Sequence, residues 1–271
     1  MCELFAMSSR LPTTVGFSLD ILARHGGLEG PHKDGWGVGY YQGNDVSVLR
    51  ETKAAAESPL VKFIEQHGPP SQLVVSHIRM ATQGKPALSN TQPFVRELAG
   101  RQHLFAHNGD LDGIEQMTEF RPNRFQPIGE TDSEIAFCHL MDSMAPMWEK
   151  SQKKPPSLES RLEIFTEFTA KLRPLGPANL LYADADVLFV HSHRRTQPDG
   201  ENKPPGLYLL QRRCKRDQDQ IPPKESTQSP QQQQIVLIAS VPLTEEPWEP
   251  MVLGEIVVLS AGEIVNRQPI T

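Results

Sequence analysis

Cys2 brings together two groups that are useful for amide hydrolysis, provided that Met1 is removed. A residue as small as cysteine in second place permits that removal, which would leave a thiol and a free α-amine on one residue. A thiolate is a good nucleophile, and an α-amine titrates at about pH 7.7–8, so it can act as a base near neutrality. The position alone also fits a buried structural cysteine at the start of a strand.

Arg79 follows an apolar stretch over residues 73–78 and precedes a polar segment that contains Thr82 and Gly84. A guanidinium in that place can bind a planar carboxylate through two parallel hydrogen bonds, and Thr82 can add a hydroxyl. This pattern predicts a carboxylate site. A solvated surface arginine is the alternative.

Asn108 and Gly109 follow a strand-like stretch over residues 103–107. An asparagine amide and the next backbone N–H, held at the end of a strand, can stabilise an oxyanion. Asn-Gly is equally typical of a plain hairpin turn, so both interpretations are open on these two residues alone.

Asp132 stands at the predicted start of a helix, after Thr131. Its carboxylate could bind a substrate ammonium group. The alternative is a helix N-cap, a position that Asp and Thr both favour.

The order of these segments resembles that of the class II glutamine amidotransferases, a family of N-terminal nucleophile hydrolases. Within the family, the chain resembles the stand-alone bacterial members, which have no synthase domain. The resemblance rests on five ordered segments and one strand opening: Cys2, Arg79-Met80-Ala81-Thr82-Gln83-Gly84, Asn90-Thr91-Gln92-Pro93, His107-Asn108-Gly109, Thr131-Asp132-Ser133-Glu134, and Asp34-Gly35-Trp36-Gly37. Chance agreement of five motifs in one order is improbable, so the chemical interpretation of each segment gains support from the others.

The resemblance implies a chemistry centred on Cys2 as the nucleophile, with its α-amine as the general base. Asn108 and Gly109 would stabilise the tetrahedral oxyanion. The side-chain amide of glutamine would be hydrolysed through a Cys2 thioester, and the ammonia would be released for an unknown acceptor.

The same resemblance implies that Arg79, helped by Thr82, binds the α-carboxylate of glutamine and that Asp132 binds its α-ammonium. It also implies an α+β fold, a four-layer αββα sandwich with two mainly antiparallel sheets between helical layers. No metal and no cofactor are expected.

Three functions remain open on the sequence. The first is a glutaminase that hands ammonia to a separate synthase, because residues 1–271 are expected to form a single domain without a fused acceptor domain. The second is a γ-glutamyl amide hydrolase without ammonia transfer. The third is a non-catalytic binding module on the same fold.

Composition excludes several other classes. The net charge is −6, so nucleic acid is not an expected partner. Neither a signal peptide nor an apolar run of about 18–20 residues is evident, so we expect no membrane association and a cytoplasmic location. The three cysteines are widely spaced, which argues against a disulfide framework. His191 and His193 have no third ligand in view.

The elements that must position these residues follow from apolar periodicity and turn signals. Helices are predicted over 15–24, 58–66, 133–144 and 158–172. Strands are predicted over 2–7, 36–41, 46–49, 73–78, 103–107, 180–182, 187–190, 206–210, 235–239 and 256–259. Segment 215–234, rich in Gln, Pro and Ser, is expected to be a flexible insertion.

Overall fold

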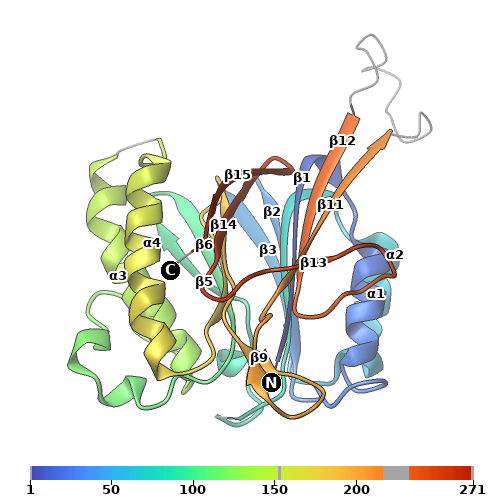
Figure 1. The fold of residues 1–271 in the computed structure, drawn as a ribbon, viewed down its shortest axis with the longest axis horizontal. Coiled ribbons are helices and arrows are strands. Elements are labelled where there is room, and N and C mark those ends of the chain that lie inside the picture. The colour runs from blue at the N-terminus through green and yellow to red at the C-terminus, as the bar shows by residue number, and fades with distance from the viewer. Residues whose placement is uncertain (1, 83, 152–153, 216–231, 270–271) are drawn as a thin grey trace.

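Two antiparallel β-sheets lie face to face, and a pair of helices covers the outer face of each (Figure 1). This computed structural model describes residues 2–82, 84–151, 154–215 and 232–269. The four layers are helices, sheet, sheet and helices, so the predicted αββα sandwich is confirmed.

The first sheet has seven strands in the order β13-β11-β12-β1-β4-β2-β3. Their bounds are β1 (Glu3–Thr13), β2 (Trp36–Gln42), β3 (Asp45–Glu51), β4 (Ser71–Ile78), β11 (Tyr208–Lys215), β12 (Gln232–Ala239) and β13 (Glu249–Pro250). β1 lies between β12 and β4, so the start of the chain is inside the sheet and not at its edge.

The second sheet has six strands in the order β15-β14-β8-β7-β6-β5. Their bounds are β5 (Phe94–Leu98), β6 (Arg101–Asn108), β7 (Asn179–Ala183), β8 (Leu188–His191), β14 (Ile256–Ser260) and β15 (Glu263–Gln268). Two short strands, β9 (Arg195–Thr196) and β10 (Asn202–Lys203), form a separate antiparallel pair.

The helices are α1 (Gly16–His25), α2 (Pro59–His67), α3 (Asp132–Lys150) and α4 (Leu158–Leu172). Single 3-10 turns are η1 (Ala55–Glu57), η2 (Leu88–Asn90), η3 (Ile114–Gln116), η4 (Thr118–Phe120) and η5 (Arg173–Leu175). Ser58, Thr131 and Ser157 cap α2, α3 and α4, because each hydroxyl accepts a backbone N–H of the first turn.

Several element boundaries differ from the predictions: β1, for example, was expected over 2–7 but runs from Glu3 to Thr13, and strands β5, β9, β10, β13 and β15 were not predicted. α3 was expected to end near residue 144, yet it continues past Pro146 to Lys150, since Trp148 is buried and the packing of the last turns outweighs the proline. β11 begins at Tyr208, later than expected, and runs on to Lys215.

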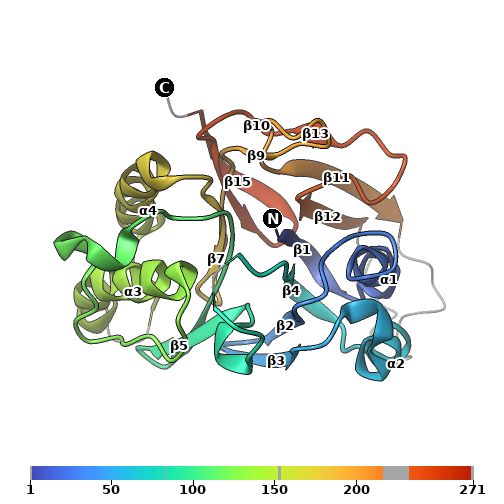
Figure 2. The ribbon, with the colours of Figure 1, turned by 90° about the horizontal axis from the view of Figure 1, so that it is seen from below.

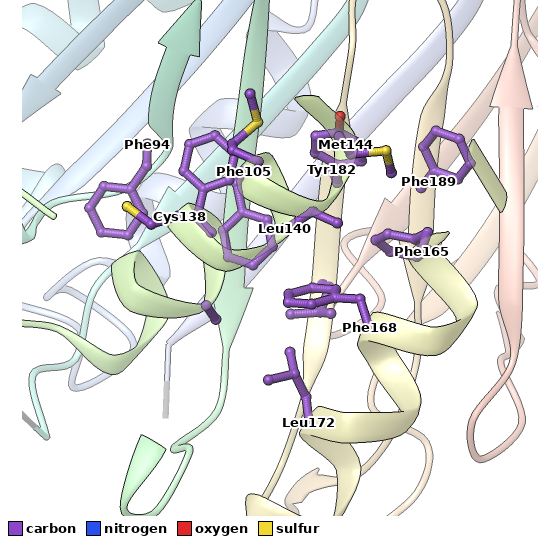
Figure 3. Packing of buried hydrophobic residues seen from close by; sticks show 14 of the residues in the cluster. Phe94, Phe105, Cys138, Leu140, Met144, Phe165, Phe168, Leu172, Tyr182 and Phe189 are labelled. Carbon is purple, nitrogen blue, oxygen red and sulfur yellow. The ribbon is translucent and has the colours of Figure 1, made fainter. Parts of the chain in front are cut away.

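Three apolar layers hold the sandwich together. One lies between the two sheets, one under α1 and α2, and one under α3 and α4. In the last layer, Phe165 and Phe168 of α4 point onto the sheet beside Phe105, Tyr182 and Phe189 (Figure 3). Each aromatic ring buried in this way contributes about 1.5–3 kcal/mol.

The expected insertion over 215–234 falls mostly outside the described residues. Its ends are strand residues, because Lys215 belongs to β11 and Gln232–Gln234 to β12. Segment 216–231 therefore connects two paired strands.

Candidate active site

Cys2 lies immediately before β1, and its sulfur contacts the backbone of Met80, the second residue after β4. The N–H of Met80 donates to Cys2 Sγ at 3.4 Å, and Sγ lies 3.5 Å from the Met80 carbonyl oxygen. Burial raises the pKa of the Cys2 thiol to about 11. The thiol is therefore protonated at neutral pH, and a nearby base is needed before it can attack.

Arg79 is buried beside Cys2, since Ile78 at the end of β4 pairs with Glu3 of β1. Its guanidinium donates from Nη2 to the Gly84 carbonyl at 3.0 Å and from Nη1 to the Lys85 carbonyl at 3.3 Å. The segment after β4 thus folds back around the guanidinium and fixes its position next to the thiol.

Asn90 holds this segment in place. Its Nδ2 donates to the Lys85 carbonyl at 3.0 Å, and its Oδ1 accepts the N–H of Glu130 at 2.8 Å. Gly84 has a φ of +70°, and a Cβ there would lie 2.8 Å from Asn90 Nδ2. Only glycine fits between the asparagine and the arginine.

Asn108 ends β6 in the opposite sheet, and its side chain is buried. Its Nδ2 donates to Ser240 Oγ at 3.3 Å, and Ser240 Oγ also accepts the N–H of Leu4 at 3.0 Å. Asn108 is therefore connected through one hydroxyl to the second residue after Cys2. β6 ends at Asn108, and the next strand that pairs with it, β7, begins only at Asn179. Asn108-Gly109 therefore does not form a hairpin turn, and that interpretation is wrong.

Gly109 has no room for a side chain, because an added Cβ would lie 1.7 Å from the Pro177 carbonyl oxygen. The chain can therefore pass from Asn108 to Asp110 only with glycine between them. This close approach fixes the position of the backbone at the predicted oxyanion site.

Thr82 and Asp132 both connect to the segment after Gly109. The Thr82 hydroxyl donates to the Asp110 carboxylate. The Asp132 carboxylate accepts the N–H of Leu111 at 2.7 Å and that of Ser133 at 2.7 Å. Because both Asp132 oxygens accept backbone donors, Asp132 positions the segment, while Thr131 and not Asp132 is the N-cap of α3.

The predicted site residues gather at one end of the sandwich. Figure 2, seen from below, has the N-terminal end of β1 near the middle of the fold, with β4 on one side and β12 on the other. Cys2 is adjacent to the Arg79–Met80 backbone, Ser240 links Asn108 to Leu4, and Thr82 binds Asp110. Asp132 accepts a hydrogen bond from Leu111, two residues after Gly109.

Over the described ranges, no group of three or more His, Cys, Asp or Glu side chains is arranged to hold a metal ion. A search of the same residues for a helix long and apolar enough to cross a bilayer finds none.

The site combines a thiol at the start of a central strand, a buried arginine beside it and an asparagine from the facing sheet. This arrangement agrees with one known family. Residues 1–270 match the family model for class II glutamine amidotransferases. The chain belongs to this family.

Similar amidotransferases cover the chain almost completely. YafJ of Escherichia coli K12, which is assigned to the glutamine amidotransferases, is 34% identical over 266 residues, or 98% of this chain and 100% of YafJ. The crystal structure of a predicted glutamine amidotransferase from Pseudomonas aeruginosa has 30% identity and a TM-score of 0.66, covering 98% of this chain and 100% of that one. The phosphoribosylpyrophosphate amidotransferase of Bacillus subtilis, with 16% identity, a TM-score of 0.61 and coverage of 98% and 49%, shows the fold alone.

Four side chains around this amidotransferase site were not given a role from the sequence: Gln92, Asp110, Asn179 and Ser240. Gln92 and Asp110 lie within or next to the recognised motifs, so their places in the sequence were a usable signal. Asn179 donates to the Asn108 carbonyl at 3.0 Å. Asn179 and Ser240 lie far from every motif, and only the fold brings them to Asn108.

Proposed function

We propose that the protein hydrolyses the side-chain amide of glutamine, or of a γ-glutamyl amide, through a thioester on Cys2. The observation that carries the proposal is the position of Cys2 Sγ against the backbone of Met80, directly beside Arg79. The position of Asn108 supports the proposal, because Ser240 connects the Asn108 amide to Leu4 of β1, two residues after Cys2.

The α-amine of Cys2, freed by loss of Met1, is the proposed base. A thiol whose pKa burial has raised to about 11 does not ionise by itself at neutral pH. An amine that titrates at about pH 7.7–8 on the same residue can take the thiol proton, directly or through one water. While Met1 remains, the nitrogen of Cys2 is an amide and cannot act in this way.

The proposed reaction has two steps. Sulfur attacks the amide carbon, and the oxyanion that forms is stabilised by Asn108 Nδ2 and the N–H of Gly109. The carbon–nitrogen bond then breaks, and the ammonium of Cys2 returns its proton to the departing nitrogen. Water next attacks the thioester, which releases glutamate and restores the thiol.

Arg79 is proposed to bind the α-carboxylate and Thr82 to assist it, with Asp132 proposed for the α-ammonium. The hydrogen bond from Thr82 to Asp110 adds a second carboxylate at this side of the site. The released ammonia is proposed to pass to a separate synthase, with residues 1–271 acting as one glutaminase domain.

Intact-mass analysis with 6-diazo-5-oxonorleucine, an electrophile that mimics glutamine, tests the proposal. The protein should lack Met1 and gain one adduct, which Cys2→Ala abolishes together with glutamine hydrolysis. Cys138→Ala is the matched control, since Cys138 is a buried residue of α3 and should have no role. Full turnover by protein that retains Met1, or by Cys2→Ala, would reject this chemistry. A protein free of Met1 that takes up no label would favour the binding-module alternative.

A further inference from the structure

His107 is a buried histidine near the end of β6, on the face of the strand that α3 covers. Its Nδ1 lies 2.9 Å from the hydroxyl of Ser133, in the first turn of α3, and its Nε2 lies 3.1 Å from the carbonyl oxygen of Pro177. Burial lowers the pKa of His107 below 6.5, so the ring is neutral at neutral pH. Its side chain has no role in the reaction described above, although it directly precedes Asn108 and Gly109.

The two contacts of the ring determine which nitrogen carries the proton. A carbonyl oxygen can only accept, so Nε2 of His107 donates to Pro177. Nδ1 of the neutral ring is then an acceptor, and the Ser133 hydroxyl donates to it. The other acceptor near this hydroxyl, Asp132 Oδ1, is farther away at 3.2 Å. Ser133 therefore orients the ring, and the ring holds the Pro177 carbonyl.

The Pro177 carbonyl lies directly against the α-carbon of Gly109. A Cβ on Gly109 would lie 1.7 Å from the Pro177 oxygen and 2.8 Å from His107 Nε2. A second close approach joins the same two segments, because a Cβ on Gly176 would lie 2.0 Å from the Asp110 carbonyl oxygen. Since no free space separates the segments, a shift of the Pro177 carbonyl would move the peptide that carries the Gly109 N–H.

We propose that His107 is a positioning residue for the oxyanion: its ring, oriented by Ser133, holds the Pro177 carbonyl against Gly109 and so keeps the Gly109 N–H directed at the reacting carbonyl. This inference rests on the proposed function. His107 transfers no proton in this role, since Ser133 and Pro177 engage both of its nitrogens. Its effect should fall on kcat, because the oxyanion exists only after sulfur has attacked.

Two substitutions of His107, compared by steady-state hydrolysis of glutamine, test the proposal. His107→Asn can keep a bond with Ser133, but it has no donor that reaches Pro177. Its kcat should fall by about 10- to 100-fold with little change in KM, since the oxyanion donors remain but one is misdirected. The longer side chain of His107→Gln can place an N–H where Nε2 lies, so its kcat should return to within about 5-fold of the wild-type value.

Ser133→Ala is a milder change that keeps the ring and its bond to Pro177. Without the hydroxyl the ring is less well oriented, so kcat should fall by about 3- to 10-fold. This variant keeps the proposal testable if His107→Asn does not fold.

His103→Asn is the matched control. His103 lies on the same strand and the same face as His107, is also buried, and bonds the Tyr182 hydroxyl at 2.7 Å. Its kcat should equal that of the wild type. Thermal unfolding of every variant should show that each is folded.

Alkylation of Cys2 by iodoacetamide separates the positioning of the oxyanion donor from general damage to the site. The thiolate displaces iodide without forming an oxyanion, so the rate should be the same in the wild type and in every folded variant. A fall in alkylation that matches the fall in kcat would overturn the proposal, because the thiol itself would then be disturbed.

A normal kcat in folded His107→Asn or in Ser133→Ala would also overturn the proposal. The same holds if His107→Gln is no better than His107→Asn, or if His103→Asn loses as much activity as His107→Asn. In each of these cases the proposed function would stand. Wild-type protein without Met1 that hydrolyses neither glutamine nor a γ-glutamyl amide would instead count against the proposed function itself.

Discussion

Gln92 forms both backbone hydrogen bonds of His107 with its side-chain amide. Its Oε1 accepts the His107 N–H at 2.6 Å, and its Nε2 donates to the His107 carbonyl at 3.2 Å. Both residues are buried. The side chain thus takes the place of a neighbouring strand beside β6, directly before Asn108, and keeps this proposed oxyanion residue in register.

Replacing Gln92 by leucine should destabilise the protein and lower its kcat. The change leaves the His107 N–H and C=O buried without partners, which should cost about 2–4 kcal/mol in the free energy of unfolding. kcat should also fall, because Asn108 loses its alignment. Urea unfolding and steady-state kinetics measure the two effects. Gln72→Leu, at an exposed position of β4, should change stability by no more than about 0.5 kcal/mol; equal effects of the two changes would contradict this account.

Removing the Asn108 amide should lower kcat by about 10²–10³ with little change in KM, because one oxyanion donor is lost. Ser240→Ala should lower kcat less, since it only loosens the orientation of Asn108. Asn123→Ala, on the exposed segment before α3, is the control and should keep wild-type kinetics. An unchanged kcat in Asn108→Ala would remove this residue from the mechanism.

Arg79→Lys should raise the KM for glutamine by about 10- to 100-fold and alter kcat less, because lysine cannot form the bidentate contact with a carboxylate. The thermal midpoint should be recorded as well, since Arg79 also binds the Gly84 and Lys85 carbonyls. Arg24→Lys, in an exposed ion pair with Glu29, is the control. A normal KM in folded Arg79→Lys would place the carboxylate elsewhere.

The ion pair between Glu3 and His25 should make stability depend on pH. The hydrogen bond with Glu3 raises the pKa of His25 above 6.5. The stabilisation that protonated His25 provides is therefore complete below pH 6.5 and is lost as the pH rises through the raised pKa. Burial opposes ionisation of Glu3, yet the hydrogen bond to His25 brings the pKa of Glu3 below 4.5, so its contribution is lost on acidification. The pair therefore stabilises most between pH 4.5 and 6.5.

Glu3→Gln should accordingly cost on the order of 1–3 kcal/mol at about pH 5.5 and less at about pH 8.5. Chemical unfolding at the two pH values measures the difference. Glu201→Gln, at an exposed site beside Lys203, should show no such pH dependence. The same loss of stability at both pH values in Glu3→Gln would mean that the ion pair does not titrate in this range.

Asp184→Asn should destabilise the protein by about 3–5 kcal/mol, because it leaves the charge of Arg161 partly unpaired in the interior. Asp184 Oδ2 lies 2.7 Å from Arg161 Nη1, and both side chains are buried where α4 packs on the β7–β8 turn. Differential scanning calorimetry measures the effect. Asp199→Asn, in an exposed pair with Lys203, should leave the unfolding temperature unchanged; a similar shift in both variants would argue against the buried pair.

The sequence determined the local features of this protein and the order of its chemical groups. α4 begins and ends where its apolar periodicity predicts, and Ser58 caps α2 as its type and position indicate. These features depend on residues within one or two helical turns, so a single stretch of sequence contains their causes. The recognised motifs gave the family in the same way, since each motif is a short contiguous segment.

The tertiary structure alone decided which distant side chains complete the site. Asn108 and Ser240 are 132 positions apart, and Asn179 lies 71 positions from the carbonyl it binds. Nothing local in the sequence links such pairs, because their contact depends on the order in which strands assemble into two sheets and on how those sheets face each other. For that reason the hydrogen bond from Arg195 to the Ser240 carbonyl became visible only in the folded chain.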